Sequence, residues 1–594
     1  MIKKMTKYSF VVFHREVEDF LRNLQEIGVV DITRQKRAID SYSMEKFEEI
    51  ARYNAAASAL KRIKDEALKK KEEIPAGKPH ESDLLGLYTA SVAEKEALRN
   101  RIYVLKGELA DALPWGAFTQ ENLDSIGKLG LTPYFYVASA QKYNREWESL
   151  YPIQILGEQG GKIYFAALSE DGSRPSIPLP DSKFPSVSAD VLQQQLEELE
   201  LKAANVQQTL LALTNCLEEL DAQKENLFTN LDRYLASEAS VKKADETIVI
   251  FEAFAPAEID TDVVQFLEEN NVYYLKEEAR NEDNPPVKLK NNFFARLYEP
   301  IGELYMLPKY GELDLTPFYA PFYMLFFGFC LGDMGYGLVM MLVGTFAALK
   351  LPKFADYGKL IIWLGLGTII IPALGGTVFG AKIYDLVQLP TNIKDLFFND
   401  MQMFWFAILF GIFHIIVARL IHCVYNIVKG NWNTGLNALG WAISIAWATL
   451  AYASSEGGFT YAGWLNYIGM AGLLLIIVCG SDAKNPIVRL FKGTFSLYDS
   501  TGVFGDVLSY IRLFGLATSG GILGFVVNSI ALTLGELPYI GWLLMGVMLI
   551  FGHIFVMLLS SLGAFVHPLR LTFIEFYKNA GFEGGGRPYN PLKK

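Results

Sequence analysis

The chain has 594 residues, a net charge of −11, 51% hydrophobic residues and a mean hydropathy of +0.19. These averages combine two unlike halves. The first 316 residues contain 38 basic and 53 acidic residues, whereas the remaining 278 contain 16 and 12. The composition therefore predicts a membrane protein with a large acidic, water-facing region. It excludes the strongly basic class of nucleic-acid-binding proteins, and the unpaired spacing of the four cysteines excludes a disulfide framework.

The N-terminus has no long apolar core and no cleavage site of small residues, so we expect no signal peptide. A net acidic segment of 316 residues precedes the first apolar block. Without an export signal, we expect this half to remain in the cytoplasm.

A helical rod is predicted in the first half. Between Leu192 and Leu231, apolar residues recur at alternating spacings of four and three, interrupted only at Lys224. This spacing is typical of a coiled-coil seam, and 40 residues would give an arm of roughly 60 Å. A second tract is interrupted by the run at 69–77. We expect coiled-coil helices over about 44–113 and 187–238 to pair antiparallel. From the pattern alone, a spacer or dimerisation element is the simpler interpretation.

Two small α/β lobes are predicted at the ends of the rod. Strand-like runs occur at 134–138, 162–167 and 247–254. One lobe is expected over about 1–40 together with 240–316, and the other over 114–186. Residues 1–316 would thus form an α+β arm. No GxxxxGK[ST] motif occurs in the sequence, so nucleotide hydrolysis is not expected of this chain.

The second half, 317–594, is predicted to be an all-α membrane domain. A crossing needs about 20 residues, and three of the seven apolar blocks are much longer. The blocks are 317–349, 360–380, 401–428, 436–453, 461–480, 503–534 and 539–576.

Charges in the loops orient these blocks, because basic loops stay on the cytoplasmic side. The basic positions are Lys350, Lys353, Lys359, Arg419, Lys429, Lys484, Arg489, Lys492, Lys578, Arg587, Lys593 and Lys594. The intervening loops carry Asp385, Asp395, Asp400, Glu456 and Glu536, opposed by Lys382 and Lys394. A cytoplasmic N-terminal half then requires the first block to cross twice, with a turn at 332–337. About eight crossings result, with both termini inside. A single long tilted helix is the alternative.

Two arginines stand inside apolar blocks, Arg512 in the sixth and Arg570 in the last. Inserting an arginine into the centre of a membrane helix costs about 2.5–3.5 kcal/mol on insertion scales, so we expect each of these residues to have a function. Arginine does not lose its proton, so neither residue carries a proton by titrating. A fixed positive charge can instead stabilise a passing carboxylate as its anion. Asp506 is six residues from Arg512 and not on the same helix face, and Glu575 is expected near the interface.

Simpler explanations exist for each feature. Arg570 could reach the headgroups, and an acid elsewhere in the chain could neutralise Arg512. Asp333 is expected to be a turn and cap residue. Four membrane histidines could be packed and hydrogen-bonded, namely His414, His422, His553 and His567, although His567 shares a helix face with Arg570. Small residues around Arg512 would let another helix pass close, or would serve ordinary packing: Gly505, Ser509, Gly515, Ala517, Ser519, Gly520, Gly521 and Gly524.

Four sequence motifs carry a resemblance to a known family. They are FGFCLGDMGYG at 327–337, SYIRLFGL at 509–516, HPLRLTFIEF at 567–576 and EGGGRPYNP at 583–591. With the two-lobed arm, the chain resembles over essentially its whole length the a subunit, or subunit I, of V-type and archaeal-type rotary ATPases. The two arginine motifs in this order are the most specific part of the resemblance.

The resemblance implies a non-hydrolytic stator subunit of an ion pump or ATP synthase. The matching arginines, Arg512 and Arg570, would face a rotating ring of carboxylate-bearing c/K proteolipids between two aqueous half-channels. Half-channel candidates are Ser509, Ser560, Ser561, His567 and Glu575, with Ser560 standing where some relatives have glutamate. No catalytic residue, metal site or cofactor is expected.

The resemblance also implies partners and a location. Besides the ring, we expect the peripheral-stalk E and G subunits, the central-stalk d/C subunit and the lipid bilayer, in a prokaryotic plasma membrane. Whether the ion is H⁺ or Na⁺ is not encoded here, because selectivity belongs largely to the ring.

Two competing functions remain at this stage. A stand-alone secondary transporter would have inverted repeats and broken helices, but no internal repeat is visible and the rod would have no task. A membrane-anchored scaffold or sensor would leave Arg512 without a purpose.

Overall fold

The computed structural model describes residues 1–34, 37–72, 74–75, 77, 83–170, 172–243, 247–386, 390–455, 460, 462–481 and 485–593. It divides into two compact units. The first comprises Met1–His14, Val29–Thr33 and Val241–Pro591, and the second comprises Arg15–Gly28, Arg34–Ser240 and Leu592–Lys594. The loop charges at Glu456, Lys484 and Lys594 lie outside the described residues.

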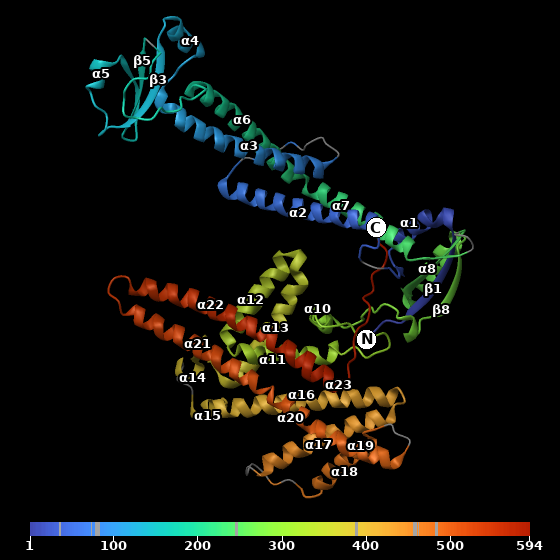
Figure 1. Ribbon diagram of the computed structural model, residues 1–594. Helices are drawn as coiled ribbons and strands as arrows, with labels where there is room; N and C mark the ends of the chain where they lie inside the picture. The colour runs from blue at the N-terminus through green and yellow to red at the C-terminus, as the bar shows by residue number, and fades with distance from the viewer. Residues whose placement is uncertain are drawn as a thin grey trace. The chain divides into compact units, whose positions relative to one another are not determined.

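An antiparallel sheet forms the non-membrane part of the first unit (Figure 1). Its strand order is β2-β7-β1-β8, with β6 paired to β7. Alternate residues of β1, namely Tyr8, Phe10 and Val12, are buried, as expected for a strand with one covered face. The strands are β1 Met5–Phe13, β2 Asp31–Ile32, β6 Val241–Lys243, β7 Ile248–Pro256 and β8 Tyr273–Glu278, and the short helices are α8 Asp260–Glu269, α9 Phe293–Arg296 and α10 Glu299–Glu303.

A second antiparallel sheet, β3-β5-β4, lies in the second unit. Tyr136 and Phe165 stack at its centre with ring centroids 5.6 Å apart. The strands are β3 Thr132–Ser139, β4 Ile153–Gln159 and β5 Lys162–Ser169, accompanied by α4 Gln120–Lys128 and α5 Trp147–Leu150. Strands predicted from the three apolar runs of the first half are therefore confirmed.

Long helices make up the rest of the second unit: α1 Val17–Ile27, α2 Ser41–Lys70, α3 Leu84–Ala112, α6 Ala189–Leu213 and α7 Leu217–Glu238. Helix α3 packs against α6, and α2 packs against α7. Lys95 bonds Gln207, while Lys106, further along α3, bonds Glu200, so this pair runs antiparallel.

The tract 44–113 is divided into α2 and α3 next to the run at 69–77, as predicted, whereas the tract 187–238 is interrupted where the pattern suggested one helix. A 3₁₀ turn, Thr214–Cys216, separates α6 from α7. There the Thr214 hydroxyl donates to the Leu211 carbonyl (2.6 Å) and Asn215 donates to Pro75 O (2.7 Å). Such side chains compete with regular helical bonding. Other 3₁₀ turns are His14–Glu16, Leu113–Trp115, Ala257–Ile259, Asn281–Asp283, Pro352–Phe354 and Leu497–Asp499.

The C-terminal half is mostly helical, and the coarse fold class is confirmed: a mixed α/β region followed by apolar helices. The helices are α11 Thr316–Leu331, α12 Met334–Lys350, α13 Ala355–Gly375, α14 Ile383–Leu386, α15 Thr391–Lys394, α16 Asp400–Val428, α17 Trp432–Ser455, α18 Leu465–Cys479, α19 Pro486–Ser496, α20 Ser500–Leu508, α21 Ile511–Gly535, α22 Gly541–Arg570 and α23 Tyr577–Ala580. Strands β9 Thr377–Val378 and β10 Ala381–Lys382 form a small hairpin, and Leu571–Phe576 is a π-helical segment.

Five helices among the described residues are long and apolar enough to cross a membrane, and α11, α12 and α18 are shorter apolar helices. The first apolar block is not one long helix. It is interrupted at Gly332, which has φ +69°, and at Asp333. Gly337 of α12 meets Gly365 of α13 and Gly344 meets Gly358, so these two helices run antiparallel with their backbones in close contact.

A buried ion pair connects the segment before α2 to α7. Arg34 donates from Nε and Nη2 to the two carboxylate oxygens of Asp232, at 2.6 Å each, and the two side chains are 3% and 13% exposed. We predict that Arg34→Ala lowers the free energy of unfolding of the second unit by about 3–5 kcal/mol, because it leaves a buried charge unpaired. Urea unfolding followed by hydrogen exchange of α7 peptides measures this.

Arg22→Ala is the matched control. Its pair with Asp19 is solvent-exposed, so the expected change is about 0–1 kcal/mol. Equal effects of the two substitutions would contradict the assignment.

Candidate functional site: the arginines of α21 and α22

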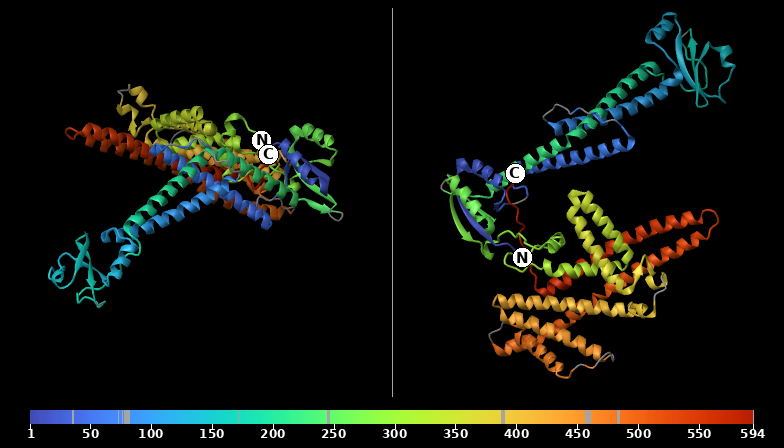
Figure 2. Two further views of the ribbon diagram at one scale, coloured as in Figure 1. Left: turned by 90° about the horizontal axis from the view of Figure 1, so that it is seen from above. Right: turned by 180° about the vertical axis from the view of Figure 1, so that it is seen from behind.

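Helices α21 and α22 lie side by side as an antiparallel hairpin, whose connecting loop extends beyond the neighbouring helices in Figures 1 and 2. Small residues lie at several of their contacts. Gly520 lies opposite Ser560, Val527 opposite Gly552, and Gly535 opposite Met545. Continuing this register along the pair brings Arg512 level with His567, within one turn of Arg570.

Arg512 is the second residue of α21, directly after a break between α20 and α21. The break is fixed by Tyr510, which is fully buried and bonds His414 Nδ1 through its hydroxyl at 2.9 Å. Its ring lies so close to Gly411 that a Cβ there would be 2.1 Å from it. The predicted hydrogen-bonded role of His414 is thereby confirmed.

The guanidinium of Arg512 lacks a full set of partners. Its Nη1 is buried and has no hydrogen bond among the described residues, and no carboxylate of the described chain lies within ion-pair distance of it. Burying a charge without pairing is costly. Asp506, which is not expected on the same helix face as Arg512, has other partners. Its carboxylate accepts hydrogen bonds from Lys578 Nζ (3.2 Å) and Asn579 Nδ2 (3.0 Å).

Arg570 is the last residue of α22 and is exposed. It ends a stripe spaced by three and four residues along one face of the helix. The other members are exposed by 48–68%: Phe551, Phe555, Leu559, Leu562 and Val566. In the apolar stretch of the span Gly541–Ala580, which contains α22, only 6% of the residues are buried, less than in any other candidate span of the described chain. One fixed charge thus sits at the end of a wide, uncovered apolar face.

The chain changes geometry around Arg570. Pro568 lies inside the last turn of α22, and the π-helical segment Leu571–Phe576 follows. Proline removes a backbone donor, and π-helical turns occur frequently at functional sites. This local geometry separates Arg570 from the buried residues that follow it.

Glu575, which is expected near the membrane interface, is shielded from solvent within the fold. Glu575 is 2% exposed within the π-helical segment, and its Oε2 has no hydrogen-bond partner among the described residues. Its backbone carbonyl accepts a bond from Asn579 (2.6 Å). The reason is tertiary: packing of the π-helical segment against α16 covers a position that would be peripheral on a lone helix.

The remaining predicted site residues are distributed along the hairpin. Ser509 ends α20 and donates to Gly505 O at 3.1 Å. Ser560 faces Gly520 across the helix seam, and Ser561 is half-buried. His567 lies within electrostatic reach of both Arg512 and Arg570. The structure therefore gathers His567 with the two arginines, and places Ser560 and Ser561 two turns away along α22.

Asp333 lies outside this group, at the N-cap of α12. Its carboxylate is 1% exposed and accepts backbone N–H groups of Gly335 (2.8 Å) and Tyr336 (3.3 Å). It also accepts those of Phe379 (2.8 Å) and Gly380 (2.7 Å), in the β9–β10 hairpin. Sequence reasoning missed this second pair because nothing local marks a contact between segments so far apart. For the same reason it missed Asn528, whose Nδ2 donates to the Phe379 carbonyl at 2.7 Å.

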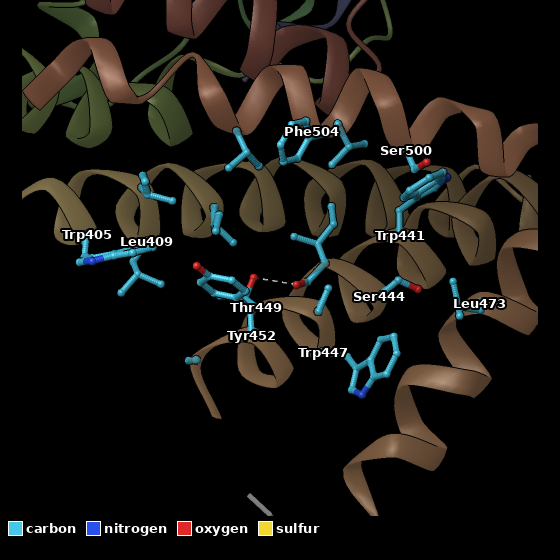
Figure 3. Close-up of a pocket in the computed structure, with 17 residues that line it drawn as sticks. Trp405, Leu409, Trp441, Ser444, Trp447, Thr449, Tyr452, Leu473, Ser500 and Phe504 are labelled. Atoms are coloured by element: carbon cyan, nitrogen blue, oxygen red, sulfur yellow. Dashed lines mark hydrogen bonds between the residues drawn. The ribbon is translucent and has the colours of Figure 1, made fainter. Parts of the chain in front are cut away.

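Two of the cavities in this half lie beside α20 and α21. One, of about 600 Å³, lies between α16, α17, α18 and α20, and Figure 3 shows its lining of aromatic and aliphatic side chains such as Trp405, Trp441 and Phe504. The second, of about 460 Å³, adjoins α21 and includes Lys382, Asp400 and Thr518 in its lining. Only the second offers charged groups. Within the described chain, no cluster of three His, Cys, Asp or Glu residues could hold a metal ion.

Sequence comparisons relate the chain to known proteins. Residues 180–362 match the V-type ATPase 116kDa subunit family. The A-type ATP synthase subunit I of Methanocaldococcus jannaschii is 28% identical, over 59% of this chain and 56% of that protein. That of Pyrococcus abyssi is 31% identical, over 54% and 50%. The V-type ATP synthase subunit I of Borreliella burgdorferi is 23% identical over the full length of both.

The matched segment thus spans about half the length of these archaeal relatives and all of the bacterial one. A crystal structure of the cytoplasmic N-terminal domain of subunit I, homolog of subunit a, of V-ATPase also matches, with 13% identity, 46% of this chain and 100% of that one covered, and a TM-score of 0.16. That score is too low to support a structural argument. The sequence matches confirm the resemblance drawn from the motifs: the chain is similar to subunits of V- and A-type ATPases. Within that class, it is similar to the subunit named I.

The bonds of Asp506 generate a prediction. We expect Asp506→Leu to release α23 from α20 and to lower stability by about 1–3 kcal/mol, because Lys578 and Asn579 lose their shared acceptor. Hydrogen exchange of peptides covering 575–582 should rise. Asp499→Leu, at an exposed position of the same segment, is the control and should leave exchange unchanged. Unaltered exchange in Asp506→Leu would refute the connection.

Proposed function

We propose that the chain is the membrane stator subunit of a rotary V/A-type ATPase, in which Arg512 and Arg570 meet carboxylates of a rotating proteolipid ring. The observation that carries this proposal is the half-buried Arg512 in the apolar half, whose buried Nη1 has no hydrogen bond and whose guanidinium has no acidic partner in the described chain. A membrane charge of this kind needs a counter-charge. The wide exposed face of α22, which ends at Arg570, is where another chain would supply it.

The fixed charges would control when a ring carboxylate is ionised. A carboxyl group in the lipid environment stays neutral while it holds its ion, since burial disfavours the anion. Beside Arg512 and Arg570 the anion is stabilised, so the ion is released there and rebound only after the ring has moved on. Because arginine remains protonated, the same charge blocks ions from crossing directly between two aqueous half-channels.

The half-channels would open from opposite sides toward the arginines. Polar side chains near the cytoplasmic end, namely buried Glu575 and the partly exposed Ser509 and His567, suit one of them. The cavity beside α21 with Lys382 and Asp400 suits the other. The proposal requires eight crossings, with α11, α12 and α18 as short spans beside the five longer ones, and with both termini in the cytoplasm of a prokaryotic cell.

The paired helices of the second unit would serve as the stator arm. In this proposal, α2, α3, α6 and α7 form an antiparallel coiled coil between two lobes, within an arm of residues 1–316. Its acidic surface would hold the peripheral-stalk subunits E and G, with the central-stalk subunit d/C nearby. The antiparallel pairing of α3 with α6 supports this interpretation. The chain itself would hydrolyse no nucleotide.

Arg512→Ala tests the proposal directly. We expect ATP-driven ion transport in reconstituted complex to fall at least about 100-fold, while the complex still assembles, because the ring carboxylates lose the charge that makes them release their ions. Transport is followed by a pH- or sodium-sensitive dye in vesicles.

Lys492→Ala is the control, since this charge is exposed in α19, outside the α21–α22 pair, and should not affect coupling. Coupled transport at the wild-type rate in Arg512→Ala would exclude the proposed role.

Purification from native membranes separates the proposal from a stand-alone transporter. We expect a ring of small hydrophobic subunits and ATP-hydrolysing subunits to co-purify with the chain in mild detergent, because the exposed face of α22 needs a partner. Mass spectrometry of the intact complex identifies them. A chain that purifies alone and transports ions on its own would favour the transporter.

A further inference from the structure

The tip of the β9–β10 hairpin inserts between α12, α21 and α22. Gly380 touches Gly524 of α21 so closely that a Cβ on Gly380 would lie 2.3 Å from the Gly524 carbonyl carbon. Phe379 adopts φ +47°, a conformation unusual for a residue with a side chain, and its backbone N–H is held by Asp333 at 2.8 Å. Such an outlier persists only where the surroundings impose it.

A chain of hydrogen bonds runs outward from this tip. The Tyr336 hydroxyl bonds His553 Nδ1 at 2.8 Å, and His553 Nε2 bonds Asn528 Oδ1 at 3.0 Å. Asn528 Nδ2 then donates to the Phe379 carbonyl at 2.7 Å. Four segments are joined in this way: α12, α22, α21 and the β9–β10 loop.

The direction of every bond in the chain can be assigned. A carbonyl only accepts, so the amide nitrogen of Asn528 must face Phe379 and its oxygen must face His553. His553 Nε2 therefore carries a proton and donates to Asn528. In the neutral ring, Nδ1 accepts from the Tyr336 hydroxyl, so both ring nitrogens are satisfied.

We propose that this hydrogen-bonded chain is a latch that fixes the register of α21 against α22, and so positions Arg512 relative to Arg570. Asn528 lies 16 residues after Arg512, and His553 lies 17 before Arg570. The latch therefore sits about 25 Å from the arginines along both helices. It rests on the proposed function, because it assigns a purpose to the spacing of the two charges.

The latch specifies the register of the two helices, which the apolar contacts do not. Elsewhere the seam between the two helices is made of small and aliphatic residues such as Gly520, Val527 and Gly552. Such contacts are little changed when one helix slides by a turn, about 5.4 Å. Directional bonds between polar side chains do specify register, as polar residues do in coiled coils and membrane helix pairs.

Asn528→Leu removes two links of the latch and keeps the branching and the number of non-hydrogen atoms of the side chain. We expect coupled transport to fall about 5- to 50-fold, with assembly and ATP hydrolysis retained. His553→Gln preserves a donor toward Asn528 and should retain most transport. Ser529→Ala is the matched control, since its hydroxyl bonds only its own helix, at Phe525 O, and it should behave as wild type.

A disulfide separates positioning from a direct role in ion transfer. A Cβ on Gly552 would lie 3.5 Å from Val527 Cβ, within the range for a disulfide. The pair Val527→Cys/Gly552→Cys, one residue from each latch residue, would fix the same register covalently. The four native cysteines are all buried, so they are retained in the protein that carries the engineered pair. We expect the oxidised pair to restore at least half of the transport lost in Asn528→Leu, and a reductant to abolish the recovery.

Two outcomes overturn the latch. One is unchanged transport in Asn528→Leu. The other is a disulfide that forms, as verified by mass spectrometry, yet does not restore transport, which would show that the side chains act directly. Failure of the proposed function looks different: the wild-type complex itself would then show no ATP-driven transport, or Arg512→Ala would retain it.

Discussion

The cost of holding a guanidinium in an apolar surrounding governs the organisation of the membrane half. Arg512 retains a buried nitrogen without a partner, and the nearby acid Asp506 is committed to Lys578 and Asn579. A chain folding only for its own stability would neutralise or exclude such a charge. The proposed function follows from supplying the missing counter-charge from outside.

Backbone proximity makes this arrangement possible. Glycines bring α12 against α13, Gly411 makes room for Tyr510, and Gly380 meets Gly524. In a membrane, helices associate through close packing and interhelical hydrogen bonds rather than through the hydrophobic effect. The scaffold around α21 is therefore built from small residues, whereas α22 is left largely uncovered.

Local geometry and long-range bonds divide the work of placing the two arginines. The break at Ser509–Tyr510 and the Pro568 turn set the positions of Arg512 and Arg570 on their own helices. The chain from Tyr336 to Phe379 sets the helices against each other at the far end. The local geometry can be predicted from the sequence around each arginine. The hydrogen-bonded chain depends on four distant segments coming together.

The sequence by itself determined the apolar half, the strands at 134–138, 162–167 and 247–254, and the choice of Arg512 and Arg570, because hydropathy, alternation and a misplaced charge are local signals. Only the tertiary structure decided that Glu575 is buried, that Thr214 interrupts the second rod helix, and that Asn528 and His553 share a bond. Each of these depends on which distant segment covers a residue or accepts its proton, and spacing along one chain does not contain that information.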